Sequence, residues 1–130
     1  MDMKLFPKLL IIVFISLNFQ CSKSNSDDGT VTRQILNQKK ANIQTYINSF
    51  DCSQSSGCMS MAFGSKPCGG PWEYIVFPNS VDIQTLTQMV NEYNEMEHQF
   101  NIETGAFSDC MYVGPPTQIE CVNGECTIIN

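Results

Sequence analysis

The chain has 130 residues, of which 15% are charged and 42% are hydrophobic. This balance excludes a highly charged disordered tail and a membrane protein with several spans, and the length suits at most one domain. The formal net charge is −6, and the sequence contains seven cysteines. So many cysteines in a short chain are typical of an oxidising compartment. The few cations are scattered, so nucleic acid is not an expected partner.

The first 20 residues have the organisation of an export signal. Lys4 and Lys8 make the start of the chain positive, and an apolar run over residues 9–17 follows. Nine residues of helix span only about 14 Å, against about 30 Å for the hydrocarbon core of a bilayer. A signal peptide is therefore favoured over a membrane span. Its removal would leave 110 residues with a net charge of −7, because two lysines and one aspartate would be lost.

A cysteine follows the apolar run closely. Cys21 comes after Phe19 and Gln20 and precedes the polar stretch 22–29. Residues 1–29 thereby resemble the signal and tether of bacterial lipoproteins, in the relaxed form found in Bacteroidota, where large residues stand before the cysteine. The resemblance implies that Cys21 carries palmitate-type acyl chains and anchors the chain to the membrane. It further implies a place in the cell envelope at the outer membrane, on either its periplasmic or its surface face.

The other six cysteines form an even set that an oxidising compartment can pair completely. They are Cys52, Cys58, Cys68, Cys110, Cys121 and Cys126. Six cysteines allow fifteen connectivities, and the sequence supplies a geometric argument for one pair. Cys121 and Cys126 would face each other across a hairpin, close enough for a local bridge. The alternative is that both form longer cross-links to the remaining cysteines, which would constrain the unfolded chain more.

Residues 30–130 are expected to form a single disulfide-stabilised α+β domain. Apolar residues at helical spacing predict helices near residues 32–50, with Thr30 as the N-cap, and near residues 81–101, with Ser80 as the N-cap. The second helix is expected to end before Gly105. Both helices would pack their apolar faces on a small antiparallel sheet.

The strands of this sheet are expected at residues 72–77, inside the sheet, at 110–113, and in a hairpin over 118–129. The Asn123-Gly124 pair predicts a two-residue hairpin turn. That turn would pair Ile119 with Ile128 and set the remaining register. Residues 51–71, rich in Ser and Gly, are expected to be an irregular loop held by disulfides.

Residue types that serve catalysis or metal binding are scarce in the sequence. His98 is the only histidine, and it is expected to be exposed on the polar side of the second helix. The cysteine spacings lack the Cys-x-x-Cys pair typical of zinc sites, and Met59 and Met61 beside Cys58 are expected to fill the core rather than bind copper. The acidic residues around the second helix are expected to be solvated rather than catalytic: Glu92, Glu95, Glu97, Glu103 and Asp109. We therefore expect no enzyme activity, no metal and no cofactor.

Several short motifs of residues 30–130 are similar to those of small bacterial exported proteins of uncharacterised activity. They are the segment 63–72, Tyr93-Asn94-Glu95, Ser108-Asp109-Cys110 and residues 123–126. This resemblance implies export but no particular activity. The expected function is a membrane-anchored, non-catalytic binding or structural domain whose protein partner is unknown. The alternative is an inhibitor of an extracellular hydrolase such as a protease, with residues 53–66 as its rigid loop.

Overall fold

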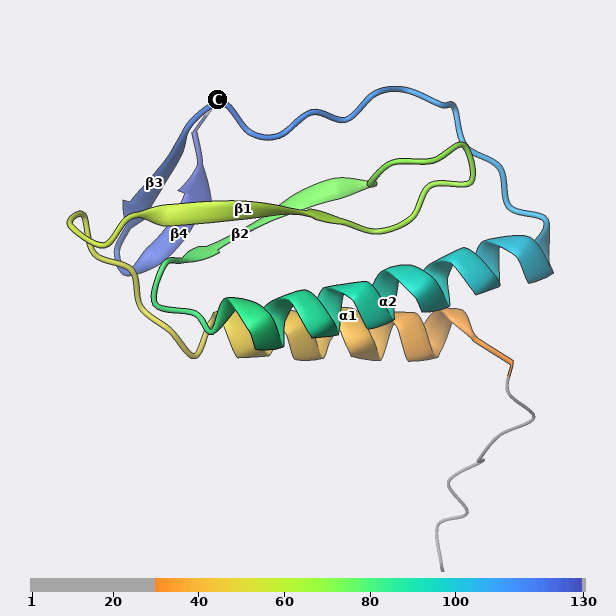
Figure 1. Cartoon of the computed structure of the whole chain (residues 1–130), viewed down its shortest axis with the longest axis horizontal. Helices are drawn as coiled ribbons and strands as arrows, with labels where there is room; N and C mark the ends of the chain where they lie inside the picture. Colours follow the sequence, from red (N-terminus) through yellow and green to blue (C-terminus); the bar gives the residue numbers. More distant parts are fainter. Residues whose placement is uncertain (1–29, 130) are drawn as a thin grey trace, which may run out of the picture.

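The computed structural model describes residues 30–129 (Figure 1). The expected signal peptide, Cys21 and the tether lie outside these residues. Two helices lie side by side, a two-stranded antiparallel sheet lies over them, and a second two-stranded sheet packs against the first sheet. Three disulfides cross-link the domain, so the predicted disulfide-stabilised α+β class is confirmed. Within residues 30–129, no helix has the length and apolar character needed to cross a membrane.

Helix α1 spans Arg33–Ile47 and helix α2 spans Ile83–Thr104. Their N-caps differ from the predicted ones, because Thr32 accepts a hydrogen bond from Ile35 N–H and Asp82 accepts one from Thr85 N–H. Hydrophobic periodicity places a helix but does not single out one of several neighbouring polar residues as its cap. The predicted end of α2 is confirmed, since Gly105 adopts the left-handed conformation at φ 62°.

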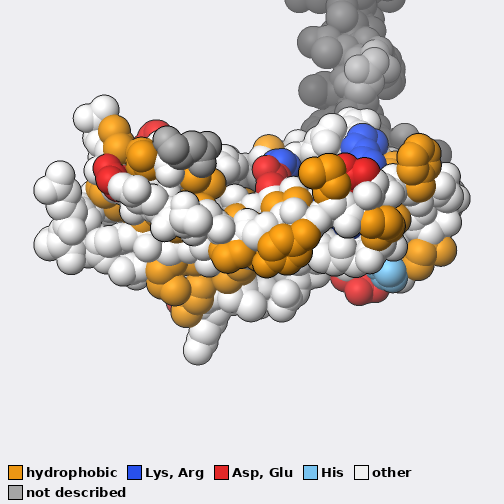
Figure 2. Space-filling view, turned by 90° about the horizontal axis from the view of Figure 1, so that it is seen from above, with side chains coloured by type: hydrophobic (Ala, Val, Ile, Leu, Met, Phe, Trp, Pro, Cys, Tyr) orange, Lys and Arg blue, Asp and Glu red, His pale blue; other side chains and the backbone are white. Residues whose placement is uncertain are grey.

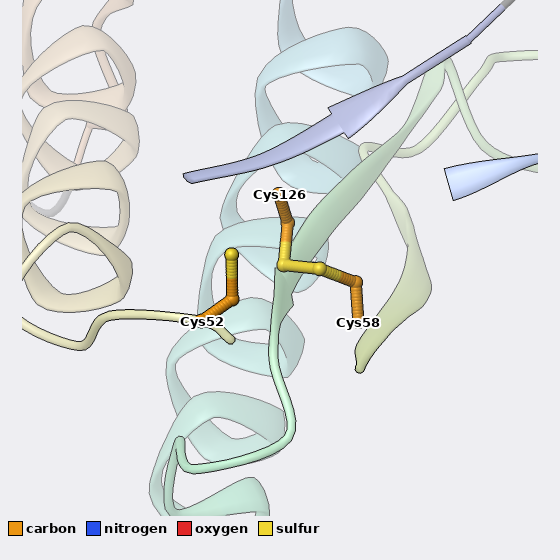
Figure 3. A group of neighbouring side chains, drawn as sticks. All are labelled: Cys52, Cys58 and Cys126. Atoms are coloured by element: carbon orange, nitrogen blue, oxygen red, sulfur yellow. A yellow bond between two sulfur atoms is a disulfide. The ribbon is translucent and has the colours of Figure 1, made fainter. Parts of the chain in front are cut away.

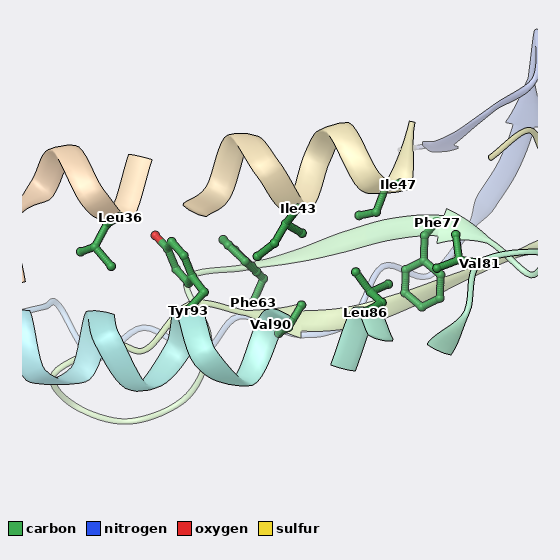
Figure 4. Packing of buried hydrophobic residues seen from close by; sticks show 9 residues of the cluster. All are labelled: Leu36, Ile43, Ile47, Phe63, Phe77, Val81, Leu86, Val90 and Tyr93. Atoms are coloured by element: carbon green, nitrogen blue, oxygen red, sulfur yellow. The ribbon is translucent and has the colours of Figure 1, made fainter. Parts of the chain in front are cut away.

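The core lies between the two helices and the first sheet (Figure 4). Its buried residues are Leu36, Ile43, Ile47, Phe63, Phe77, Val81, Leu86, Val90 and Tyr93. Figure 4 shows the side chains of α1 and α2 pointing toward one another, with Phe63 and Phe77 entering from the strands. The rings of Phe63 and Tyr93 stack with their centroids 4.3 Å apart. Burying a side chain of this size contributes about 1.5–3 kcal/mol, so this cluster supplies most of the cohesion.

The first sheet pairs β1 (Cys58–Phe63) with β2 (Glu73–Pro78) in antiparallel register. The prediction of an irregular loop over 51–71 is therefore wrong for residues 58–63. β1 is hard to recognise because Met59, Ser60 and Met61 are neither β-branched nor aromatic. The prediction that residues 72–77 lie inside a sheet is also wrong. Among the described residues, β2 has ladder hydrogen bonds with β1 alone, and β4 packs beside it without joining its ladder.

The second sheet is the hairpin of β3 (Ile119–Val122) and β4 (Glu125–Ile128). Its register is the predicted one, with Ile119 opposite Ile128 and Cys121 opposite Cys126. Asn123 at φ 53° and Gly124 at φ 87° form the turn, whose left-handed pair matches the twist of the strands.

Residues 110–113 do not form the predicted strand. The chain from 106 to 116 contains no helix, strand, turn or bend, and it runs along the top of the molecule in Figure 1. The physical reason is that, within residues 30–129, no neighbouring strand forms ladder hydrogen bonds with this segment. Instead, Met111 N–H donates to the side chain of Asp109, and Met111 C=O accepts from the side chain of Lys66.

Candidate functional site

The six cysteines of the described domain form three disulfides, Cys52–Cys121, Cys58–Cys126 and Cys68–Cys110. Of the two alternatives that the sequence left open, the local bridge between Cys121 and Cys126 is not formed and the longer cross-links are, although the Cα atoms of these two residues are direct partners in the hairpin. Cys121 bonds to Cys52, which precedes β1, and Cys126 bonds to Cys58, the first residue of β1. The longer cross-links bind the hairpin to the rest of the domain, which a local bridge would not do.

The first two bridges lie against each other (Figure 3). The sulfurs of Cys52, Cys58 and Cys126 all lie within 4.8 Å of one another, and Figure 3 shows the Cys52 sulfur beside the Cys58–Cys126 bond. This spacing is short enough for a shared metal ion, but all three sulfurs are held in disulfides. A disulfide sulfur is not a thiolate, which is the form of cysteine that binds zinc. The role of this cluster is therefore to fasten the hairpin to β1.

The only histidine and most of the acidic residues lie where the sequence placed them. His98, Glu92, Glu95 and Glu103 are exposed on α2, and Asp109 is exposed in the segment that follows this helix. Glu97 differs, because only 4% of its surface is accessible. The prediction of a solvated position was wrong for this residue. The sequence contains a signal that could have found it, since Tyr93, Glu97 and Asn101 follow one another at steps of four along the buried stripe.

The buried Glu97 carboxylate is fully engaged by other groups. Ser65 N–H donates to Oε2 at 2.7 Å, and the Tyr93 hydroxyl donates to Oε1 at 3.2 Å. The Arg33 guanidinium lies 3.7 Å from Oε1 and also covers the ring of Phe100. A buried carboxylate is tolerated when it is paired and hydrogen-bonded in this way. Glu97 therefore acts as a structural acceptor that joins α2, α1 and the β1–β2 connection.

Two amides of α2 hold the same connection. Gly64 N–H donates to Asn94 Oδ1 at 2.8 Å, and Asn101 Nδ2 donates to Ser65 C=O at 2.7 Å. Gly64 has φ 87°, and a Cβ at this position would lie 2.8 Å from Trp72 Cδ1, so no larger residue fits. The polar side chains of α2 thus fix the backbone of residues 64 and 65.

The fixed connection in turn holds the 106–116 segment. Lys66 is 6% accessible, and its ammonium donates to Met111 C=O at 2.8 Å. The same ammonium lies 3.6 Å from the Asp109 carboxylate and 5.2 Å from the centre of the Trp72 ring. The Cys68–Cys110 disulfide adds a covalent link two residues further along. Together these contacts form a clamp, and no local pattern in the sequence indicates that Lys66 is part of it.

The clamped chain presents large apolar side chains to solvent. We call residues 106–113 the exposed segment. Phe107 is 91% exposed, Met111 is 68% exposed and Tyr112 is 87% exposed. Figure 2 views the molecule from the side of this segment and shows hydrophobic side chains in several groups on the surface. Such side chains on a segment that is held in place are typical of an interaction site rather than of a flexible loop.

A groove of about 470 Å³ runs beside the exposed segment, with Phe107 at one rim. It is lined by two ion pairs, Arg33 with Glu97 and Lys40 with Glu73. Because each charge already has an internal partner, a charged ligand would have to displace one of them. The groove is therefore a weaker candidate than the exposed segment for the main binding site.

The loop expected for an inhibitor, residues 53–66, is not a free loop. Residues 58–63 are strand β1, and Phe63, Gly64 and Lys66 are buried. Its backbone is engaged by β2 and by the side chains of α2. Residues 53–66 therefore do not form one continuous exposed loop, and inhibition of a hydrolase through them stays an untested prediction.

Comparisons of the chain with models of protein families, with curated proteins and with solved structures found no match.

The Tyr93 hydroxyl provides a test of the Glu97 network. Burial raises the pKa of Tyr93 to about 12, and the adjacent Glu97 carboxylate adds to the increase. Because the folded pKa lies above the usual value of about 10, the contribution of this group to stability is complete below pH 10 and is lost as the pH rises toward 12. An ultraviolet titration of the folded protein should show one late tyrosine, and Tyr93→Phe should remove it. An unchanged titration in Tyr93→Phe would contradict this assignment.

Proposed function

We propose that this protein is an exported, lipid-anchored domain that binds a protein partner through the exposed segment without catalysing a reaction. The observation that carries the proposal is the exposure of Phe107, Met111 and Tyr112 on a chain held by the clamp. Unbound, these side chains leave a large apolar area in water, and covering them would be favourable by about 25 cal/mol for each Å² buried.

The polar groups near the segment support binding rather than catalysis. The buried groups Glu97, Asn101 and Lys66 are used to hold backbone atoms or neighbouring side chains. His98 is exposed on α2, and the four charged groups of the groove, which Phe107 also lines, are paired with one another. A rigid frame with exposed apolar side chains fits a recognition surface, since little conformational entropy is lost on binding.

The anchor is the first arm of the test. The lipoprotein-like sequence around Cys21 supports acylation at this residue. A single acyl chain holds a protein only weakly, so stable attachment requires more than one chain. Cys21→Ser should move the protein from the membrane fraction to a soluble or unprocessed form and abolish labelling by fatty-acid analogues. A Cys21→Ser protein that is still cleaved and still sediments with membranes would contradict the anchor.

The binding surface is the second arm. Phe107→Ser with Tyr112→Ser should abolish capture of the partner from the cell envelope or the surrounding medium. The matched control is Ile83→Ser with Ile102→Ser, which removes two exposed apolar side chains from α2. If both double variants recover the same proteins as the wild type, the exposed segment is not the binding surface.

A further inference from the structure

The groove beside the exposed segment has the size of a small-molecule binding site. Its volume is about 470 Å³, and sites for small molecules typically occupy about 300–1,000 Å³. Its lining comes from both helices, from the facing ends of β1 and β2 and from the exposed segment. The core and the clamp hold these elements together, so the groove is formed before a ligand arrives.

The charges of the groove disfavour a charged ligand. The charged side chains of the lining are Arg33, Lys40, Glu73 and Glu97. Arg33 pairs with Glu97 at 3.7 Å, and Lys40 pairs with Glu73, so the lining has no net charge. An ion that entered the groove would lose its hydration and would find each opposite charge already paired. An uncharged ligand leaves both ion pairs intact.

The lining also offers hydrogen-bonding groups that no other described residue uses. No hydrogen bond within the part of the chain that the structure describes engages the side chain of Asn37 or the guanidinium of Arg33. Asn101 is 6% accessible, and its Nδ2 donates to Ser65 C=O, but its Oδ1 accepts no hydrogen bond there. The groove therefore presents both donors and acceptors, which is what a hydroxyl group requires.

Two aromatic rings complete the lining. Trp72 is 41% exposed and Phe107 is 91% exposed, and both border the groove. The Lys66 ammonium lies 5.2 Å from the centre of the Trp72 ring, and Gly64 lies close to Cδ1 of the same ring, so the indole is held in place. An aromatic face carries partial negative charge, and the C–H groups of a ligand pack favourably against it.

We infer that the groove binds a short, neutral sugar in its pyranose form. A pyranose has no charge, each of its hydroxyl groups both donates and accepts, and its ring presents C–H groups that can pack on an aromatic face. A purely apolar ligand would instead displace water from the amides of Asn37 and Asn101 without replacing its hydrogen bonds. The inference goes beyond the proposed function, because it adds a small ligand at a different surface from that of Met111 and Tyr112.

The test uses Trp72 as its reporter, since it is the only tryptophan of the chain and it lines the groove. The oxidised chain is titrated with the methyl glycosides of glucose, galactose and mannose and with N-acetylglucosamine. At least one of these sugars should change the fluorescence in a saturable way, with a dissociation constant of about 0.1–10 mM for a few hydrogen bonds and one stacked ring. Sodium glucuronate should give no saturable change, because its carboxylate finds no unpaired cation.

Asn37→Ala is the most informative variant, because Asn37 is exposed and lines the groove. It should raise the dissociation constant at least about fivefold, which corresponds to one lost hydrogen bond, without lowering the midpoint of unfolding. Gln34→Ala is the matched control. It removes an exposed amide of the same helix that does not line the groove, so it should bind as the wild type does. Phe107→Ala should weaken binding, and Phe107→Tyr should retain it.

The results separate sugar binding from capture of a protein partner. Tyr112 does not line the groove, so Tyr112→Ser should bind the sugar normally whatever its effect on the protein partner. The inference is overturned if none of the neutral sugars gives a saturable change, if glucuronate binds as tightly as they do, or if Asn37→Ala binds equally well.

Discussion

Replacing Cys52, Cys58, Cys121 and Cys126 together with alanine should abolish stable folding. The two bridges that they form close loops with sequence separations of 69 and 68 residues. Because Cys68–Cys110 remains, the two bridges close loops of about 27 and about a dozen residues, and in the chain-entropy description losing both should lower the free energy of unfolding by about 6 kcal/mol. That is comparable with the whole stability of a small domain. Circular dichroism and denaturant unfolding of the quadruple variant should show no cooperative transition.

Removing one of these bridges should have a smaller effect. Because the two bridges join the same two segments, 52–58 and 121–126, either bridge alone holds the other pair of cysteines close together. The loop that the second bridge then closes has only about a dozen residues. Losing either bridge alone should therefore lower the free energy of unfolding by about 3 kcal/mol and leave a folded protein. If the double variant Cys52→Ala, Cys121→Ala is as unfolded as the quadruple variant, the Cys58–Cys126 bridge alone does not hold the two segments together.

Replacing Glu97 with alanine should lower the free energy of unfolding by about 3 kcal/mol. The substitution leaves Ser65 N–H and the Tyr93 hydroxyl without their acceptor, and an unsatisfied buried donor costs about 1–3 kcal/mol. Arg33 is half exposed, so its loss of a partner adds little. The midpoint of denaturant unfolding measures the effect.

Two variants on the same helix make this result specific. Glu97→Gln keeps one acceptor oxygen and should lose roughly half as much stability. Glu95→Ala removes an exposed carboxylate that accepts only from Gln99, and it should change stability by no more than about 0.5 kcal/mol. Equal effects of Glu97→Ala and Glu95→Ala would show that the buried network contributes nothing.

The elements that the sequence predicted well are those governed by local rules. Helix α2 has a long stripe of apolar residues, and Gly105 provides its end, so both could be read from spacing. The hairpin register follows from Asn123-Gly124, since a two-residue turn leaves no freedom in the pairing. Local turn chemistry and periodicity therefore account for α2, α1 and the second sheet.

The errors concern contacts between distant segments. Residues 58–63 form a strand because β2 pairs with them, and their own composition does not indicate a strand. The hairpin geometry allows a bridge between Cys121 and Cys126. It does not indicate that the fold places Cys52 and Cys58 next to these two cysteines. Pairing among six cysteines is decided by the tertiary fold and not by spacing.

The candidate site was misplaced for the same reason. Lys66 is one of the cations that lie scattered along the sequence, yet it is buried and donates a hydrogen bond to a carbonyl 45 residues later. Glu97 was assigned to the solvated face, yet it anchors the β1–β2 connection. A charged residue is buried only when distant groups satisfy it, and those groups are invisible in a local window of sequence.

The order of the cysteines along the chain has a consequence for biogenesis. Cys52, Cys58 and Cys68 bond only to the last three cysteines, so no native bridge can close before Cys110 is available. A chain that enters an oxidising space with its N-terminus first exposes these three neighbouring thiols before any of their native partners is present. Bridges formed then are non-native and must be exchanged through mixed disulfides, a process that takes seconds to hours without a catalyst. Yield in the cell, and in refolding from reduced material, should therefore depend on a disulfide isomerase or a glutathione buffer more than on the oxidant.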